Sequence, residues 1–156
     1  MAMKQRFAVQ HDDVFPKGAF LKGEVEPVLD FDAGKRADGS MPQQLEKETG
    51  LPIWQVVVLD ADDAVGKKDT AITVKFLAKH QPVPPANDTP FPWTPVEFVG
   101  LTALPYVEYT GGKNREGQDR TRITWSYRAE SMVKPGEGAA RKPAAGGAST
   151  STKAAA

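Results

Sequence analysis

The stretch "TGLPIWQVVVLDADD", residues 49–63, decides how the rest of the chain is interpreted. Thr, Gly and Pro form a turn signal at its start, and residues 54–59 then run without a break in residue types that favour strands. Apolar residues fall on both faces of that run. We therefore expect a strand that is covered on both sides and central in its sheet, with Trp54 packing in the core.

The acids after this strand offer a second interpretation, a calcium-binding loop. Such a loop places ligands at alternate positions and ends on a Glu at position twelve. Here the third alternate position is Ala64, the glycine comes one place late, and position twelve is Ala71. The spacing does not fit calcium, so we interpret the acids as a solvated turn and predict no metal site.

The other segments show the two-residue period of strands. Residues 19–32 alternate imperfectly around Gly23, where a bulge is expected. Residues 70–79 alternate and follow the acidic turn, so they are expected to form a hairpin with the central strand. The six prolines of residues 81–95 indicate an extended connector outside any ladder. Residues 96–103 have strand-like spacing that breaks at Gly100.

The final strand has the most regular alternation in the chain. Ile123, Trp125 and Tyr127 fall on one face, and polar residues fall on the other. The alternation predicts that Trp125, like Trp54, packs in the core. Between Gly100 and this strand the pattern predicts a break at Pro105 and a long polar turn over residues 109–122.

Helical signals are confined to two short segments, residues 41–50 and 129–133. The sequence therefore predicts an all-β protein, a small barrel or sandwich of five to seven strands, with a five-stranded OB-like barrel as the first choice. We expect a single β domain over residues 1–133. Residues 134–156 lack Ile, Leu, Val and aromatics and are predicted to be a disordered tail of Ala, Gly, Ser and Lys.

Charge and composition limit the possible functions. The chain has 20 Lys plus Arg and 20 Asp plus Glu, so it lacks the overall positive charge of an obligate nucleic-acid binder. The tail from Lys134 holds four cations and one acid, which leaves a mildly acidic body. The absence of cysteine, of a secretory signal and of a run of about 20 apolar residues predicts a cytoplasmic protein without a membrane partner.

No pattern of catalytic residues is present. The two histidines, His11 and His80, are expected at the surface, no serine follows a nucleophile-elbow glycine pattern, and "GGKN" at residues 111–114 lacks the spacing of a phosphate-binding loop. We therefore predict that the protein is not an enzyme and uses no cofactor.

Nucleic-acid contact has more support in the sequence. The 109–122 turn has a local excess of two positive charges, and aromatic side chains nearby could stack on bases. Tyr106 and Tyr109 are possible stacking residues. The candidate contact residues are Lys113, Arg115, Arg120, Arg122, Arg128 and Trp93. A solvated hairpin loop without any ligand is the equally weighted alternative.

Several spaced blocks also resemble a known family. They are "DFD", "KETGLPIWQVVVLDAD", "VKFLAKHQPVPP", "FPWTPVEFVGLTALPYVE" and "ITWSYRA", spread over residues 3–133. Together they resemble the replication, integration and excision activators encoded by actinobacterial integrative and conjugative plasmids. The resemblance implies an accessory protein that promotes excision and replication of a mobile element, through DNA or through the element's own replication and recombination proteins.

Two hypotheses follow. In the first, the protein binds single-stranded or duplex DNA directly through an OB-like fold. In the second, it is an adaptor that recruits a replication initiator or an integrase without touching DNA, which suits the neutral charge and the acidic body.

Overall fold

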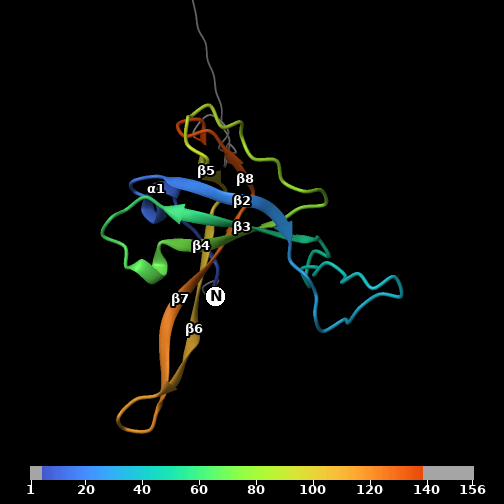
Figure 1. The fold of residues 1–156 in the computed structure, drawn as a ribbon, viewed down its shortest axis with the longest axis vertical. Helices are drawn as coiled ribbons and strands as arrows, with labels where there is room; N and C mark the ends of the chain where they lie inside the picture. Colours follow the sequence, from blue (N-terminus) through green and yellow to red (C-terminus); the bar gives the residue numbers. More distant parts are fainter. Residues whose placement is uncertain (1–4, 139–156) are drawn as a thin grey trace, which may run out of the picture.

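The computed structural model describes residues 5–138, and in it eight strands form one sheet in the order β1-β6-β7-β4-β3-β2-β5-β8 (Figure 1). The strands are β1 (Phe7–Ala8), β2 (Ala19–Pro27), β3 (Ile53–Asp60), β4 (Ala71–Leu77), β5 (Thr94–Val99), β6 (Thr102–Lys113), β7 (Asp119–Ala129) and β8 (Ser131–Val133). Two short helices complete the described part, α1 (His11–Val14) and the 3₁₀ turn η1 (Lys67–Asp69).

The centre of the sheet is the meander β2–β3–β4. β3 lies between β2 and β4 and pairs antiparallel with both, as its unbroken apolar run predicts. The register between β2 and β3 shifts between Lys22 and Glu26, and Gly23 has a φ of 84° there. The bulge predicted at this glycine is therefore confirmed.

Two long strands bend at the same level and complete the sheet. β5 runs into β6 at Gly100, and β7 runs into β8 at Glu130. Above the bend β5 pairs with β2, and below it β7 pairs in parallel with β4 through residues 127–129. Gly100 has a φ of 67°, and a Cβ at this position would lie 2.5 Å from the side chain of Glu130. The positive φ favours glycine at this bend, because another residue would be strained there and would displace the exposed Glu130 side chain.

The all-β prediction is confirmed, but the sheet is not a closed barrel. The order of paired strands ends at β1 on one side and at β8 on the other. It has eight strands instead of five to seven because the bend divides two long strands and because the two-residue β1 adds to one edge. The predicted disordered tail lies outside the described residues from position 139 on.

Several local predictions of secondary structure were wrong. Residues 129–133 form the end of β7 and β8 instead of a helix, and residues 41–50 form turns and isolated bridges such as Leu45 with Pro52. β6 continues through Pro105, which is tolerated because β1 covers only Thr102 and Ala103 of that edge. The sequence predicted a long polar turn over residues 109–122, but the observed turn is short, because β6 and β7 are paired as far as Lys113 and Asp119.

The core lies on the inner side of the curved sheet. Its fully buried side chains are Phe15, Val56, Val58, Val74, Phe76 and Val96. Trp54 is half-buried against this cluster, and its indole N–H donates to the Ala78 carbonyl at 2.9 Å. Val57, on the opposite side of β3, is 40% exposed. The prediction that β3 is covered on both sides was therefore wrong.

Among residues 5–138, no helix has the length and hydropathy needed to cross a bilayer.

His11 is half-buried and part of the packing, whereas the sequence predicted it at the surface. Its ring stacks on Phe15 and Phe98, and its Nδ1 accepts the backbone N–H of Phe98 at 3.1 Å. Burial lowers the pKa of His11 below the usual 6.5, and the charges of Glu97 and Asp12 oppose that shift only in part. The neutral imidazole is therefore the form that the fold accommodates.

We expect Trp54→Ala to lower the free energy of unfolding by about 3 kcal/mol, because a large aromatic side chain leaves the core. Trp54→Phe keeps most of the ring contact and loses only the hydrogen bond to Ala78, so it should cost about 1 kcal/mol. Urea unfolding of both variants measures the difference. An unchanged midpoint for Trp54→Ala would contradict the structural role.

The stability of the protein should fall as the pH falls below 6.5. The folded-state pKa of His11 is lower than its unfolded value, so the unfolded chain binds the proton first. The contribution of neutral His11 to the free energy of unfolding is fully present above pH 6.5, the unfolded-state pKa. It is lost as the pH falls from 6.5 through the lower folded-state pKa. Thermal melts between about pH 7.5 and 5.5 test this for the protein and for His11→Asn, whose amide oxygen can accept the same N–H without titrating. An equally steep fall in the variant would assign the pH dependence to other groups.

Candidate nucleic-acid interface

The hairpin of β6 and β7 extends away from the rest of the sheet (Figure 1). The register pairs Pro105 with Trp125, Val107 with Ile123 and Tyr109 with Thr121, and directly opposite residues share a face. The hairpin therefore has one face made of these side chains and a second face made of the residues between them. The two faces differ sharply in chemistry.

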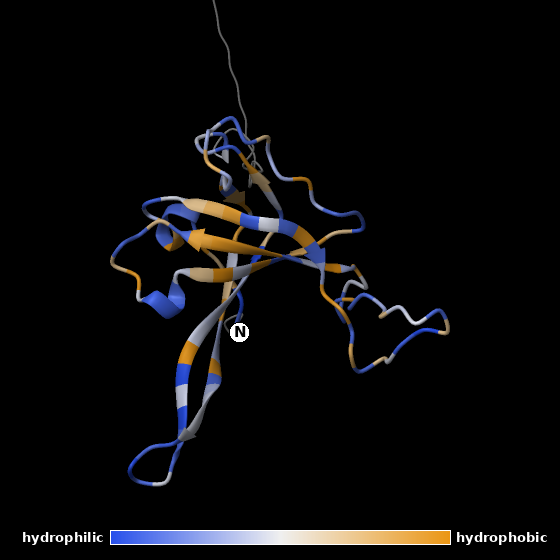
Figure 2. Ribbon diagram, viewed as in Figure 1, coloured by the Kyte–Doolittle hydropathy of each residue, from blue (hydrophilic) through white to orange (hydrophobic). Residues whose placement is uncertain are grey.

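We define the apolar face of the hairpin as Pro105, Val107, Tyr109, Ile123 and Trp125. Ile123 is 72% exposed, Val107 66%, Tyr109 58% and Trp125 43%. Figure 2 shows hydrophobic bands on both strands of the hairpin. Trp125 makes an edge-on contact with Phe7, with ring centroids 6.0 Å apart. The prediction that Trp125 packs in the core was wrong, because the side chain lies on this exposed face. The hairpin extends past the body, so no second layer formed by residues 5–138 covers this face.

The outer face is the side of the sheet opposite the core. It carries Lys75 and Arg128, which lie directly opposite each other in the parallel pairing of β4 with β7, while the neighbouring Val74 and Phe76 are buried in the core. Further residues of the same face are Gln55, Val57, Thr73, Tyr106, Thr124 and Ser126. Arg128, Tyr106 and, further along β7, Arg122 are the residues of this face that the sequence had selected.

Arg6 joins Lys75 and Arg128 to form a cluster of cations on the outer face. The Arg6 guanidinium donates to the Ser126 carbonyl at 3.0 Å and to the Ser126 hydroxyl at 3.1 Å. Burial and, as a smaller cause, the nearby charge of Arg128 lower the pKa of Arg6. None of the ion pairs found within residues 5–138 involves a member of this cluster.

Arg128 is also incompletely hydrogen-bonded. Its Nε is buried and has no partner among the described residues. A buried donor without an acceptor costs free energy, as does the neighbouring like charge. The cluster therefore gathers cations that form no direct ion pair among residues 5–138, although the charge of Glu46 lies near enough to interact with Arg128.

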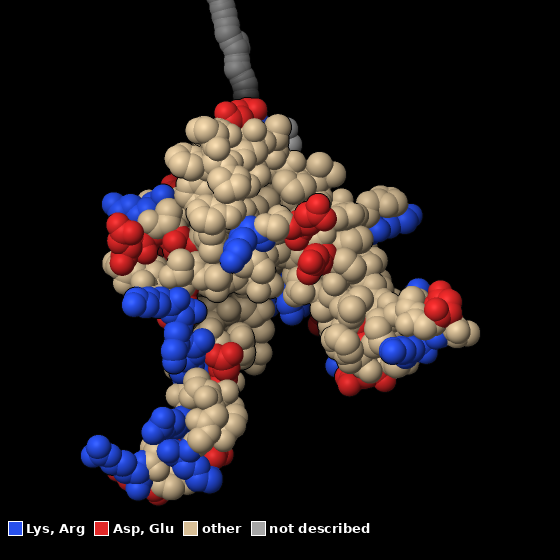
Figure 3. All heavy atoms as spheres, viewed as in Figure 1, with Lys and Arg blue, Asp and Glu red and all other residues tan. Residues whose placement is uncertain are grey.

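The other predicted contact residues do not form one site. Arg122 is held by Glu108 at 2.8 Å and by Asp69 at 3.3 Å, and Lys113 pairs with Asp119 at 2.9 Å. Arg115 and Arg120 are exposed near the end of the hairpin, where cations gather in Figure 3. Trp93 is 45% exposed but lies in the connector just before β5, apart from the hairpin end.

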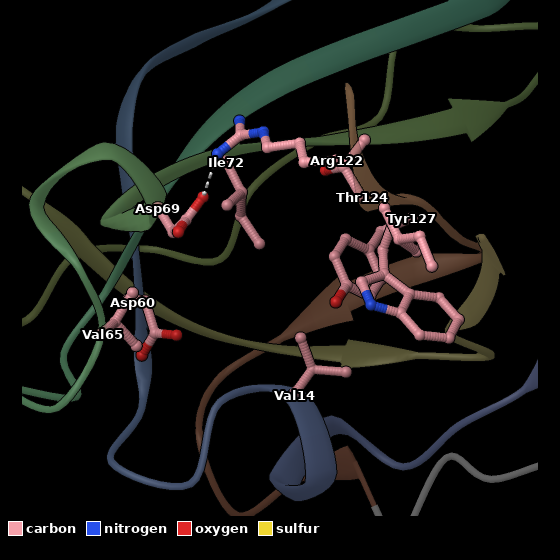
Figure 4. A pocket seen from close by; sticks show the side chains of 10 residues that line it. Val14, Asp60, Val65, Asp69, Ile72, Arg122, Thr124 and Tyr127 are labelled. Atoms are coloured by element: carbon pink, nitrogen blue, oxygen red, sulfur yellow. Dashed lines mark hydrogen bonds and ion pairs between the residues drawn. The ribbon is translucent and has the colours of Figure 1, made fainter. Parts of the chain in front are cut away.

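Two grooves flank the base of the hairpin, where β7 diverges from β4. The outer groove, of about 480 Å³, is lined by residues that include Lys68, Thr73, Lys75, Tyr106 and Thr124. The inner groove, of about 330 Å³, lies on the core side and is lined by residues that include Val14, Asp60, Val65, Ile72 and Tyr127 (Figure 4). The ion pair of Arg122 with Asp69 spans the opening between them.

The acidic side chains of the described residues do not gather into a metal site. No group of three or more His, Asp or Glu side chains within residues 5–138 is arranged to hold a metal ion. The acids after β3 hydrogen-bond to their own turn: Asp60 accepts from the backbone of Asp62, and Asp62 accepts from the backbone of Ala64. These contacts agree with a solvated turn.

Sequence reasoning missed Arg6 and Lys75. Arg6 precedes a strand of two residues, which is too short to give a periodic signal. Lys75 lies on a strand whose parallel partner is 53 residues further along the chain, as the pairing of Lys75 with Arg128 shows. The alternation of residues 70–79 did place Lys75 opposite the core face. What it could not supply was the parallel register that brings Lys75 beside Arg128.

No family model, curated protein or solved structure matches this chain. The resemblance to the replication, integration and excision activators therefore stays a prediction, as do its implications for function.

Arg128→Leu should leave the free energy of unfolding unchanged or raise it by about 1 kcal/mol, because it removes an unsatisfied buried donor and a like charge beside Arg6. Arg122→Leu is the matched comparison. It removes a guanidinium that has two carboxylate partners, so it should lower stability. Urea unfolding at low and high salt measures both. A large loss of stability in Arg128→Leu would mean that its charge is neutralised in the fold.

Proposed function

We propose that the protein is an accessory protein of a mobile genetic element and that it binds single-stranded DNA through the outer face of its sheet. The observation that carries the proposal is the cluster of Arg6, Lys75 and Arg128, three cations on one sheet face that take part in none of the ion pairs within residues 5–138. Phosphate groups of a nucleic-acid backbone are suitable partners for such a cluster.

The surroundings of the cluster support an extended ligand. In OB-type sheets one sheet face and the loops beside it bind oligonucleotides. Here the outer face has the long hairpin on one side and residues 28–52, between β2 and β3, on the other. Figure 3 shows these two segments as separate projections with a hollow between them. The pKa of Glu46, in the second segment, is lowered by hydrogen bonds from Thr49 and, to a lesser extent, by the charge of Arg128.

Tyr106 supports a single strand over a duplex. It is 45% exposed, lies on the outer face and lines the outer groove together with Lys75. An aromatic ring next to cations can stack on an unpaired base while the cations contact the backbone, and this combination is typical of proteins that bind single strands. A duplex offers no free base face at this position.

The assignment to a mobile element has a separate basis. It rests on the resemblance of five sequence blocks to the replication, integration and excision activators. An accessory protein of such an element meets single strands during replication and excision. The adaptor hypothesis rests on a different observation, the apolar face of the hairpin, and requires no contact with DNA.

Fluorescence-anisotropy titrations with labelled single-stranded and duplex DNA test the proposal. We expect Arg6→Gln/Lys75→Gln to weaken single-strand binding at least about tenfold. The slope of log K against log salt concentration should fall by the amount that corresponds to about two phosphate contacts. Lys17→Gln/Lys67→Gln is the control, because it removes the same charge outside the outer face. Tyr106→Ala should weaken binding to the single strand by about 1–3 kcal/mol and leave duplex binding unchanged.

Three results would contradict this assignment. If the anisotropy of neither DNA form changes as protein is added, the adaptor hypothesis is favoured. Equal losses in the two double variants would mean that binding follows the overall charge and not the cluster. A loss confined to Arg115→Glu/Arg120→Glu would move the contact to the end of the hairpin, where the sequence had placed it.

A further inference from the structure

The apolar face of the hairpin is large enough to need a partner. Four large side chains exposed by 43–72% leave an apolar patch of about 500 Å². An isolated two-stranded ribbon is only marginally stable in water. The hairpin is 11–12 residues long on each strand and is held to the body mainly at its base, so a second layer over this face would stabilise it.

We propose that this second layer is another copy of the same chain. In this dimer the apolar faces of two hairpins stack antiparallel about a twofold axis, so that Val107 and Ile123 of each copy lie near the axis. Two such patches bury about 1,000 Å² in total, which is the lower limit for a specific interface. A twofold arrangement uses the same surface twice and needs no other protein.

Charge complementarity favours a second copy as the occupant. The end of the hairpin, residues 113–120, has three cations and two acids. The base of the hairpin is bordered by the acidic segments 12–13 and 60–63, which have five acids and no cation. Asp60, and Val14 directly after segment 12–13, line the inner groove together with Ile123 and Trp125, so both segments lie next to the apolar face.

The length of the hairpin suits this arrangement. The six residues from Val107 to Lys113 span about 20 Å of extended strand. An axis at Val107 therefore carries the basic end of each hairpin to the base of its partner, where it meets Asp60, Asp62 and Asp63. None of these three acids takes part in an ion pair within residues 5–138.

The dimer leaves the outer faces free. The apolar face and the outer face lie on opposite sides of the same hairpin, so stacking the apolar faces directs both clusters of Arg6, Lys75 and Arg128 away from the contact. This inference does not rest on DNA binding, and the dimer can be tested without DNA.

Sedimentation equilibrium of the full chain over a range of concentrations tests the proposal. We expect a monomer–dimer equilibrium that Ile123→Lys weakens at least about tenfold, because a charge enters the centre of the apolar contact. Thr124→Lys adds the same charge at the next residue, on the opposite face, and should leave the dimer unchanged. Ile123 is 72% exposed, so its replacement should not unfold the monomer, and circular dichroism checks this.

A mixing experiment tests the antiparallel orientation. Arg115→Glu/Arg120→Glu reverses the basic end, and Asp62→Lys/Asp63→Lys reverses the acidic base. Each variant alone should dimerise more weakly than the unchanged chain, because like charges meet at both ends of the contact. A mixture of the two variants should form heterodimers. The acidic hairpin end of the first variant then meets the basic hairpin base of the second, and the basic end of the second meets the acidic base of the first.

The proposal is overturned if the unchanged chain stays monomeric at all concentrations, since the apolar face would then be open to a different protein. It is also overturned if Ile123→Lys dimerises as well as the unchanged chain. Dimers that respond to Ile123→Lys but show no preference in the mixing experiment would exclude the antiparallel orientation.

Discussion

The arrangement of the whole sheet depends on one bend, at Gly100 beside Glu130. A side chain at position 100 would meet Glu130, and the positive φ of this residue is strained for any residue with a Cβ. Above the bend β5 and β8 complete the edge of the sheet next to β2. Below it β6 and β7 turn away from the body and become the hairpin, so one backbone constraint separates the part of these strands that builds the core from the part that presents a surface.

The hairpin presents two surfaces of opposite chemistry. Its inner side continues the core side of the sheet, but apart from the contact of Phe7 with Trp125 no aromatic packing covers it among residues 5–138, and it exposes apolar side chains such as Ile123. Its other side continues the outer face and leads to the cations around Arg128. Because alternate residues of a strand point to opposite sides, the same short sequence serves both surfaces, and a substitution on one side leaves the other unaltered.

The meander could be predicted from the sequence because its signals are local. The apolar run of β3, the bulge at Gly23 and the acidic turn before β4 are all set by neighbouring residues. The alternation of β7 correctly grouped Ile123 with Trp125, but alternation says only which residues share a face and not whether another layer covers that face. The cluster at Arg128 depends on a parallel pairing between distant strands and on the two-residue β1, and neither has a local sequence signal.

The ion pair of Arg122 with Asp69 has a mechanical consequence. β7 is paired with β4 only through residues 127–129, and beyond that point this exposed ion pair spans the opening between the hairpin and the body. Exposed ion pairs weaken as ionic strength rises, so the hairpin should pivot about its base more freely in concentrated salt. The two grooves share six lining residues, among them Asp69, Arg122 and Tyr127, so they are two parts of this one opening. A pivot that separates the hairpin from the body therefore widens both grooves together, and a ligand that holds the hairpin against the body narrows both.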